Sequence, residues 1–584
     1  MTEALGSSPV YRFGAFELDS AAGELRKHGM KIKLHGQPIA ILAMLLERPG
    51  EVISREEIRK KLWPEGTIVE FEHSLNAAVK RLRDALDDLP GTPRYIETLP
   101  KHGYRFVVSR DDSDLRGKVA LAVLPFEGLG PDPELNHLSL ALTEELTTQL
   151  GGLDPEKLSV IARVSVMQFK EKEKSAAQIG RALNVSYLLS GSVRSVGGRL
   201  RVSAQLIRVS DESLIWACTY EHAAIQLLAI ERDVGHAIAH EVCLKLSVRQ
   251  LRGLQDTSAT SAEAQNEYLK GRYYSTQESN VALHLAISLF EKSITMAPGF
   301  APPYAGIAGA HVRLGHWLVV PPGQSFPKAK SAALQALDLD ESLAEARTAL
   351  ADVLFLFEWN WTEAEANYQR ALRLNPSSAQ TLRSYAGFLL ATNRFGEASM
   401  LTRRAEATDP GSTYLRAFSA AQLYSTRRYA DSIEAAKRTL MTDPDCSTAH
   451  LFLGLACVQV GRFEEAIREL QAAARSVGLK SRQAHVAYAL AVCGRVEQAE
   501  RLLNELQEES KTSYVSPWLF ANIYAGLDRK DKALECLEEC YRQREHDLVF
   551  SYVWPQFDSL HSDARWNDLM SRIGLPHFFF LNEP

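Results

Sequence analysis

The chain has 584 residues, of which 46% are hydrophobic and 24% charged, and these are ordinary values for a folded, soluble protein. It is too long for one hydrophobic core, so we expect three or more domains. Its net charge of −6 excludes a molecule that binds polyanions over its whole surface, so any DNA binding must come from a local basic patch.

Membrane and secretion signals are absent from the sequence pattern. No run approaches the roughly 18 consecutive apolar residues of a membrane-spanning helix, and the N-terminus lacks the pattern of a signal peptide. None of the seven cysteines forms a CxxC pair, which indicates reduced thiols and not a disulfide framework or a zinc site. Cys536 and Cys540 stand one helical turn apart, close enough for two metal ligands, but two packed helix cysteines are the interpretation we favour. We expect a cytoplasmic protein without metal, cofactor or membrane contact.

The first 110 residues have the pattern of a small α+β domain. Short strands are expected within residues 11–34, where apolar and polar side chains alternate between turn residues. A helix is expected to begin at Pro38 and to end before Arg48-Pro49-Gly50. Ser54 precedes Glu57 by three residues, a capping box that opens a second helix ending at Leu62-Trp63.

A third helix, expected at residues 72–86, decides the interpretation of this domain. The apolar residues at helical spacing on one side predict a core face: Phe71, Leu75, Ala78, Val79, Leu82 and Leu86. The opposite side is polar and basic, and such a helix fits the major groove of DNA, where Arg and Lys donate to guanine and Asn pairs with adenine. A hairpin is expected next, at 95–98 and 104–107, with a basic tip that can reach phosphates or the minor groove. The alternative is a merely solvated helix face, since three aspartates dilute the basic patch: Asp84, Asp87 and Asp88.

Three strings carry a resemblance to a known family: PGEVISREEIRKKLWP, FEHSLNAAVKRLRDALDD and YIETLPKHGYRFV. In order and spacing they resemble the effector domain of OmpR/PhoB-type transcription regulators, in its CadC-like variant, over nearly all of residues 10–108. The resemblance implies a winged helix-turn-helix, at residues 8–110, whose helix Glu72–Leu86 reads double-stranded DNA. Pro100 departs from the family, because this wing position is basic in PhoB-like members. Minor-groove contact would therefore fall to Lys101 or His102.

Carried over position by position, the resemblance implies DNA contacts from the third helix and the wing. Arg81 and Arg83 also fit a phosphate-positioning role, which carries no sequence information. The family's contact with RNA polymerase corresponds to the loop Trp63–Glu70, with Trp63, Glu65 and Glu70 as its expected residues. No receiver domain precedes the module in this sequence, so we expect its input from the C-terminal side. The expected DNA contacts are His73, Asn76, Lys80, Arg81, Arg83, Lys101, His102 and Arg105.

An α/β domain is expected at residues 118–250. The apolar run Val119–Phe126 suits a buried strand. The strings LAVLPFEGLG and IGRALNVSYLLSGSVR resemble the TolB-like domain, which implies no agreed chemistry. Gly191-Ser192-Val193-Arg194 is compatible with an anion nest, but a tight strand crossing is the interpretation we favour, and we assign no catalytic residue. Further elements are expected as helices at 138–151, 176–183 and 225–246 and strands at 158–162, 187–193, 199–209 and 213–220.

Residues 262–570 repeat with a period of about thirty-four residues, which is typical of tetratricopeptide repeats. Small residues that let two antiparallel helices approach keep this step: Ala364, Ala398, Ser432, Ala466, Ala499 and Ala533. Prolines such as Pro376, Pro410 and Pro444 end the second helix of a pair. We expect about eight repeats in a superhelix whose concave face binds a protein or peptide ligand. A purely structural or dimerising solenoid is the alternative. The tail 554–584 is expected to cap the last repeat.

The sequence thus predicts a multidomain protein with an α+β winged helix, an α/β TolB-like domain and an all-α tetratricopeptide superhelix. The favoured function is a bacterial one-component transcription regulator, bound to promoter DNA as a homodimer by resemblance, whose repeats sense a partner or signal. The alternative is a protein-interaction scaffold whose winged helix no longer reads DNA. An enzyme is disfavoured because no cyclase, P-loop, kinase or metal-hydrolase motif appears. A regulator that joins the winged helix directly to the repeats is disfavoured by the intervening α/β domain.

Overall fold

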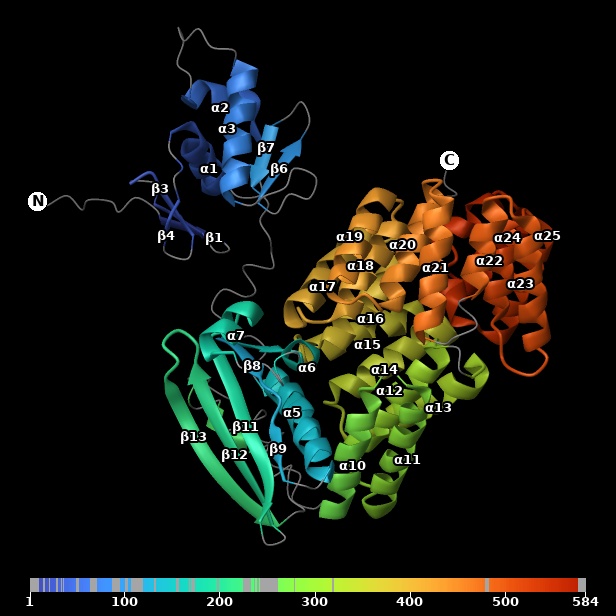
Figure 1. Ribbon diagram of the computed structural model, residues 1–584, viewed down its shortest axis with the longest axis horizontal. Coiled ribbons are helices and arrows are strands. Elements are labelled where there is room, and N and C mark those ends of the chain that lie inside the picture. The colour runs from blue at the N-terminus through green and yellow to red at the C-terminus, as the bar shows by residue number, and fades with distance from the viewer. Residues whose placement is uncertain are drawn as a thin grey trace, which may run out of the picture. The chain divides into compact units, whose positions relative to one another are not determined.

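The computed structural model divides into two compact units, residues 1–118 and 119–584 (Figure 1). Within the described part of the chain, no helix is long and apolar enough to cross a membrane. The described residues are 10–13, 16–19, 22–27, 30–32, 34, 36–48, 52–62, 71–86, 95–99, 103–106, 119–130, 133–153, 157–167, 169, 174–196, 199–223, 233–235, 237–238, 241, 261–277, 279–317, 320–477 and 483–575.

Over its described residues, the first unit combines two small antiparallel sheets with three helices. One sheet has the order β1-β2-β3-β4 and the other the order β5-β7-β6. The three helices and the closing hairpin confirm the sequence-based expectation, whereas β5 was not predicted. The elements are β1 (Val10–Phe13), β2 (Phe16–Asp19), β3 (Glu24–Lys27), β4 (Met30–Lys31), α1 (Gln37–Glu47), β5 (Val52–Ser54), α2 (Arg55–Leu62), α3 (Phe71–Leu86), β6 (Ile96–Leu99) and β7 (Gly103–Phe106).

Helix α3 is anchored by its apolar side, as expected from helical spacing. Leu75, Val79 and Leu82 are buried in one core with residues of α1 and of both sheets. The capping box at the start of α2 is present, since the Ser54 hydroxyl accepts from the Glu57 amide at 3.2 Å and the Glu57 carboxylate accepts from the Ser54 amide at 2.8 Å. Gly103 lets β7 cross β5 closely, because a Cβ there would overlap the Ile53 carbonyl.

The second unit begins with a six-stranded mixed sheet of order β10-β8-β11-β12-β13, with β9 paired beside β11. Helix α5 covers one face, and α6 and α7 lie on the other. The predicted strands and helices of this region are confirmed, except that only scattered residues within 225–246 are described. The elements are β8 (Val119–Val123), β9 (Glu127–Leu129), α5 (Pro133–Leu153), β10 (Leu158–Ile161), α6 (Arg163–Met167), α7 (Ala176–Leu183), β11 (Tyr187–Val196), β12 (Arg199–Arg208) and β13 (Leu214–Ala223).

Gly191 lies inside β11, opposite Ala204 of β12. A Cβ at this position would overlap the Ser203 carbonyl and the Phe126 ring. The close strand packing agrees with the tight crossing that we favoured over an anion nest.

Sixteen helices follow in eight antiparallel pairs within the described residues, as the thirty-four-residue period predicts. The small residues at the repeat positions, such as Ala364 and Ser432, are fully buried. The first helices of successive pairs contact one another and so share one inner face. The helices are α10 (Ala262–Ser275), α11 (Asn280–Met296), α12 (Pro302–His316), α13 (Pro322–Leu339), α14 (Ala344–Val353), α15 (Trp361–Leu374), α16 (Ala379–Ala391), α17 (Phe395–Thr408), α18 (Thr413–Ser425), α19 (Tyr429–Thr442), α20 (Ser447–Gln459), α21 (Phe463–Val477), α22 (Gln483–Val492), α23 (Val496–Glu509), α24 (Pro517–Gly526) and α25 (Lys530–Gln543).

The sheet is joined to the repeats at two places, so both belong to one unit. Helix α5 packs between the sheet and α10 (Figure 1), where the Tyr268 hydroxyl donates to Glu145 at 3.0 Å. The end of β10 meets α17, and beside it the hydroxyl of Ser165, in α6, donates to the buried carboxylate of Asp409 at 2.5 Å. Burial raises the pKa of Asp409, so this carboxylate depends on its hydrogen-bond donor.

A π-helix, η2 (Leu354–Glu358), continues α14 inside the third helix pair. The elements after the last pair are η4 (His546–Phe550), η5 (Pro555–Leu560) and α26 (Ala564–Ile573). The tail agrees with the expected cap only in α26, which packs on α25. Residues 554–560, also expected in the cap, instead contact first helices of the array. The end of α26 returns to the third helix pair, where the indole of Trp361 donates to the Ile573 carbonyl at 3.0 Å. The aromatic run 578–580 lies outside the described residues. Burial raises the pKa of Cys540 and, to about 11, that of Cys536, as in packed helix thiols.

Candidate nucleic-acid interface

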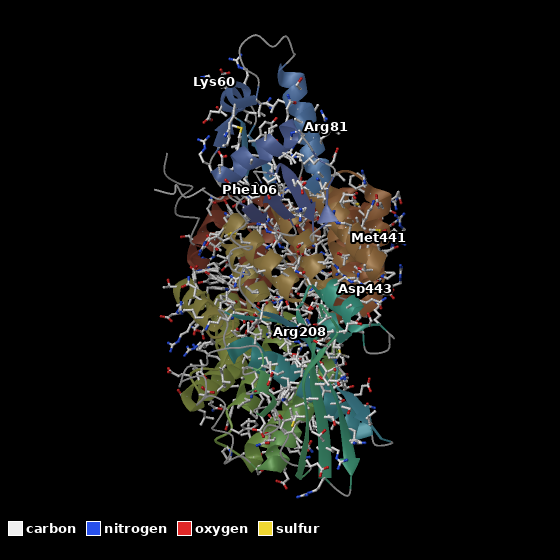
Figure 2. All side chains as sticks on the ribbon, turned by 90° about the vertical axis from the view of Figure 1, so that its left-hand side faces the viewer. Lys60, Arg81, Phe106, Arg208, Met441 and Asp443 are labelled. Carbon is white, nitrogen blue, oxygen red and sulfur yellow. The ribbon has the colours of Figure 1, made fainter. Side chains whose placement is uncertain are left out.

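The outer side of α3 carries the cationic surface that the sequence predicts. Among its described side chains, the exposed ones are Asn76, Lys80, Arg81 and Asp84. Figure 2 shows Arg81 projecting from the outside of this helix. Neither Lys80 nor Arg81 has a partner among the described residues, so both cations remain available to an anionic ligand. The carboxylate of Asp84 is the one negative group among the four.

Asn76 is held in place by the hairpin. The buried Tyr104 of β7 donates its hydroxyl hydrogen bond to the Asn76 side-chain oxygen at 3.1 Å. The guanidinium of Arg55, at the start of α2, lies over the Tyr104 ring, 5.3 Å from its centroid. The amide of Asn76 is therefore oriented before any ligand arrives, with its NH2 group left to donate. Sequence spacing gave no sign of this contact, because the two residues are 28 positions apart.

Arg83 occupies a different environment from the one we predicted. Its side chain is 9% exposed, and its guanidinium donates to the Ile96 carbonyl and to the Thr98 hydroxyl, both at 2.8 Å. These bonds tie α3 to β6. The structure thus gives Arg83 a scaffolding position and corrects its expected place on the exposed face.

Arg105 lies on the wing strand β7, where the structure leaves it half-exposed. Its guanidinium forms an ion pair with Glu97 across the hairpin, with a nitrogen-to-oxygen distance of 2.5 Å. A phosphate would have to compete with this carboxylate. Five of the predicted contact residues lie outside the described residues: Trp63, Glu65, Glu70, Lys101 and His102. The side chain of His73 is not described either.

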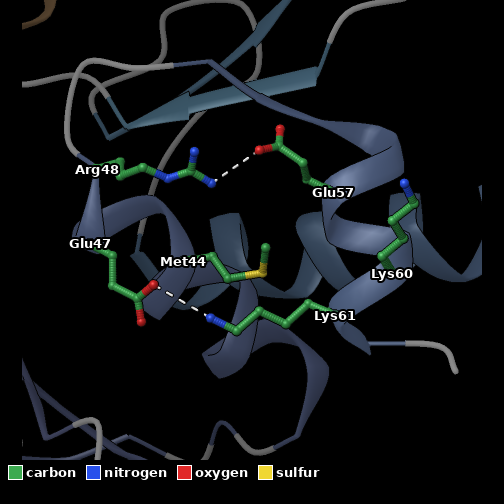
Figure 3. Close-up of a pocket in the computed structure, with 6 residues that line it drawn as sticks. All are labelled: Met44, Glu47, Arg48, Glu57, Lys60 and Lys61. Atoms are coloured by element: carbon green, nitrogen blue, oxygen red, sulfur yellow. Dashed lines mark hydrogen bonds and ion pairs between the residues drawn. The ribbon is translucent and has the colours of Figure 1, made fainter.

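A charged hollow of about 340 Å³ separates α1 from α2 (Figure 3). Two ion pairs cross it, Arg48 to Glu57 at 3.2 Å and Lys61 to Glu47 at 3.4 Å. The hydrogen bonds from Ser54 and the pairing with Arg48 lower the pKa of Glu57, so this carboxylate is ionised at neutral pH. Lys60 also lines the hollow, and its ammonium has no described partner. The two ion pairs hold α2 against α1. The residues that line the hollow include no nucleophile or acid–base pair.

Comparison with known families agrees with this geometry. Residues 29–106 match the family described as transcriptional regulatory protein, C terminal. They form an OmpR/PhoB-type winged helix-turn-helix domain. Residues 117–234 match the second domain of HilA/YgeH-like transcriptional regulators, so the TolB-like resemblance stays a prediction. Within the repeats, residues 518–547 match a tetratricopeptide repeat, and residues 370–517 match the N-terminal domain of the T7SS, ESX-1 secretion system protein EccA1.

Individual relatives match parts of the chain. The transcriptional regulator HilA of Salmonella typhimurium is 24% identical over 385 residues, which are 64% of this chain and 66% of that protein. A putative adenylate cyclase 3 of Rhizobium meliloti is 26% identical over 247 residues, 42% of each chain. The crystal structure of the response regulator DrrB, a Thermotoga maritima OmpR/PhoB homolog, is 32% identical over 17% of this chain and 44% of that chain, with a TM-score of 0.16. The chain thus spans less than two thirds of the cyclase and of HilA.

Proposed function

We propose that this chain is a sequence-specific, one-component transcription regulator that binds promoter DNA through its winged helix. The single observation that carries the proposal is the exposed face of α3, where Lys80 and Arg81 are unpaired among the described residues and Asn76 is oriented by Tyr104. An exposed helix with an oriented amide and free cations suits the major groove, where Asn reads adenine and Arg or Lys reads guanine or holds phosphate.

Other elements of the domain also carry residues that suit DNA binding. In a helix-turn-helix the first helix crosses the sugar-phosphate backbone, and α2 carries Lys60 with a free ammonium. We keep His73, Lys101, His102 and Arg105 as proposed contacts of α3 and the wing. The loop with Trp63, Glu65 and Glu70 stays a proposed contact for RNA polymerase, and a homodimer on DNA stays a proposed arrangement. Arg83 is left out, because its guanidinium is already bonded to β6.

The second unit is proposed to sense a partner or a signal in the cytoplasm, and no step of the function is catalytic. Tetratricopeptide arrays present extended surfaces for protein binding. One relative is named a putative adenylate cyclase. The described residues of this chain contain no cluster of three or more His, Cys, Asp and Glu side chains that could hold a metal ion.

Selection of genomic DNA fragments by the purified full-length chain tests the proposal. The wild-type chain is expected to enrich fragments that share one motif. The Lys80→Ala/Arg81→Ala variant is expected to lose the enrichment while its melting temperature stays unchanged, since both side chains are exposed. Equal behaviour of the two proteins would support the scaffold interpretation instead. Glu56→Ala/Arg59→Ala, which removes an exposed ion pair on α2, is the matched control.

A further inference from the structure

The inner face of the repeat array is occupied by the chain itself. We call residues His546–Leu560 the strap; they comprise η4, the connection 551–554 and η5. Both short helices contact first helices of the array, since η4 contacts α16 and η5 contacts α24. Helix η4 also contacts η2 and the second helix of the last pair, α25. Phe550 of the strap also packs edge-on against Phe355 of η2, with ring centroids 5.7 Å apart. The strap thus lies where tetratricopeptide arrays bind peptides.

Trp554 is the centre of this contact. Its ring meets four aromatic rings, each from a different first helix: Tyr424 of α18 at 6.2 Å, Phe452 of α20 at 5.9 Å, His485 of α22 at 6.4 Å and Trp518 of α24 at 5.0 Å between centroids. We call these four residues the aromatic cage. The pairs with Tyr424, Phe452 and Trp518 are edge-to-face, and such pairs add about 0.5–1.5 kcal/mol each beyond the buried area.

Polar groups of the array fix the strap on both sides of Trp554. The Trp518 indole donates to the Ser551 hydroxyl at 2.9 Å, and the Tyr424 hydroxyl donates to Gln556 at 2.8 Å. Arg427 donates to the Val553 carbonyl at 2.5 Å and pairs with Asp558 at 2.6 Å. The array therefore recognises an aromatic ring flanked by an amide and a carboxylate.

The strap is anchored by four fully buried residues that share one core with the array helices, and its weaker contacts lie between these anchors; the four are Leu548, Val549, Phe557 and Leu560. Its regular parts, η4 and η5, are 3₁₀-helices, which have poorer hydrogen-bond geometry than α-helices. Trp554 remains half-exposed, and the ion pair between Arg427 and Asp558 is 36% and 47% exposed, so it contributes little stability. All four cage residues belong to first helices of the array and none to the strap.

We propose that the strap is a built-in competitor for a partner peptide, and that the cage with Arg427 binds an aromatic, acidic segment of a partner protein after displacing it. The inference rests on the proposed function only in treating the repeats as the part that receives the signal. Because the strap is tethered, it competes at a high effective concentration. A free peptide can bind only the fraction of molecules in which the strap has left the array, so a smaller open fraction gives a weaker apparent affinity.

A labelled synthetic peptide of residues 546–560 is the probe, titrated onto full-length proteins. Trp554→Ala weakens the strap without touching the cage, and Asp558→Ala does so more mildly, through an exposed residue. Trp554→Ala is expected to bind the probe at least about tenfold more tightly than the wild-type chain. Asp558→Ala is expected to bind it up to about fivefold more tightly, because an exposed ion pair contributes little. Glu508→Ala, which breaks an exposed pair with Lys511 away from the strap, is expected to match the wild type. The same peptide with the Trp554→Ala change is expected not to bind.

Hydrogen exchange on the wild-type chain keeps the test independent of how the variants fold. Excess probe is expected to speed exchange of amides in 546–560 and to leave those of α24 unchanged. The inference is overturned if folded variants bind the probe no better than the wild type, or if the strap amides ignore the probe. DNA binding is measured on the same preparations. If the peptide test fails while the protein still binds DNA, the inference about the strap is wrong and the proposed function is unaffected.

Discussion

The Tyr104 hydroxyl, in the wing strand, donates a 3.1 Å hydrogen bond to the side-chain oxygen of Asn76, on the outer face of α3. The bond joins the two elements that meet DNA in a winged helix. Because Tyr104 is buried and lies beneath Arg55, its hydroxyl has a fixed position from which to orient the Asn76 amide. An oriented amide loses less side-chain entropy when it binds a base edge.

Tyr104→Phe is expected to weaken DNA binding about two- to tenfold, since a single hydrogen bond contributes roughly 0.5–1.5 kcal/mol. The melting temperature is expected to change little, because the ring and its packing remain. Fluorescence anisotropy with the enriched DNA fragment measures the affinity. In an Asn76→Ala background the same substitution is expected to have no further effect, and a full additional loss there would show that the hydroxyl acts on something else.

Arg81 and Arg83 are a matched pair of opposite roles on one helix. Arg83→Ala is expected to destabilise the first unit by about 1.5–3 kcal/mol, the usual contribution of hydrogen bonds to a charged group. Arg81→Ala is expected to leave stability unchanged and to weaken DNA binding. Urea unfolding and DNA titration of both variants distinguish the roles, and equal effects of the two substitutions would contradict the assignment.

Salt dependence reports how many phosphates the domain neutralises. Lysine and arginine contacts to phosphate release counterions, so the slope of log affinity against log salt changes by about 0.9 per contact. Lys60→Ala is expected to reduce the slope by about one contact and to weaken all DNA sequences alike. The control is Lys61→Ala, whose ammonium already pairs with Glu47. A change in base preference for Lys60→Ala would rule out a phosphate role.

The start of the strap predicts a pH dependence of stability. Burial alone would lower the pKa of His546, but the neighbouring carboxylates Asp547 and Glu545 outweigh it, so the pKa of His546 is raised. Burial alone would raise the pKa of Glu545, but the hydrogen bond from His546 outweighs it, so the pKa of Glu545 is lowered. The His316 ring lies 5.0 Å away, and Tyr514 donates to Glu545.

The sign of the effect differs for the two groups. The contribution of His546 is full below its ordinary pKa of 6.5 and is lost as pH rises through its raised value. The contribution of Glu545 is full above 4.5 and is lost as pH falls through its lowered value. The pair therefore contributes most to stability between pH 4.5 and 6.5, the ordinary pKa values of the two groups. His546→Gln is expected to cost about 1–3 kcal/mol near pH 6 and less at higher pH, as thermal melts across pH would show. A cost independent of pH would contradict the ion pair.

Most of the fold could be predicted from local sequence patterns. The capping box at Ser54, the apolar side of α3 and the repeat positions such as Ala364 are set by contacts within one or two turns or one repeat, so spacing alone indicates them. The outer face of α3 follows from the same spacing. Strand β5 was missed because three residues are too few to show an alternation.

Contacts between distant residues could not be predicted in this way. Arg83 lies near Lys80 and Arg81 in the sequence, but its bonds to β6 depend on how the hairpin folds back. The joint between Ser165 and Asp409 spans 244 positions, and Tyr424 meets Gln556 across 132. No periodic signal links such residues, so the position of the strap on the inner face appears only in three dimensions.

The base preferences of wild-type and Asn76→Ala full-length proteins, measured on the enriched motif with every single base-pair substitution, test the central claim most directly. If α3 reads DNA through the oriented amide, the variant is expected to lose about 1–3 kcal/mol of discrimination at one or two adjacent base pairs and to keep the rest of the profile. A profile that is unchanged, or weakened equally at every position, would contradict the assignment of α3 as the element that reads the sequence.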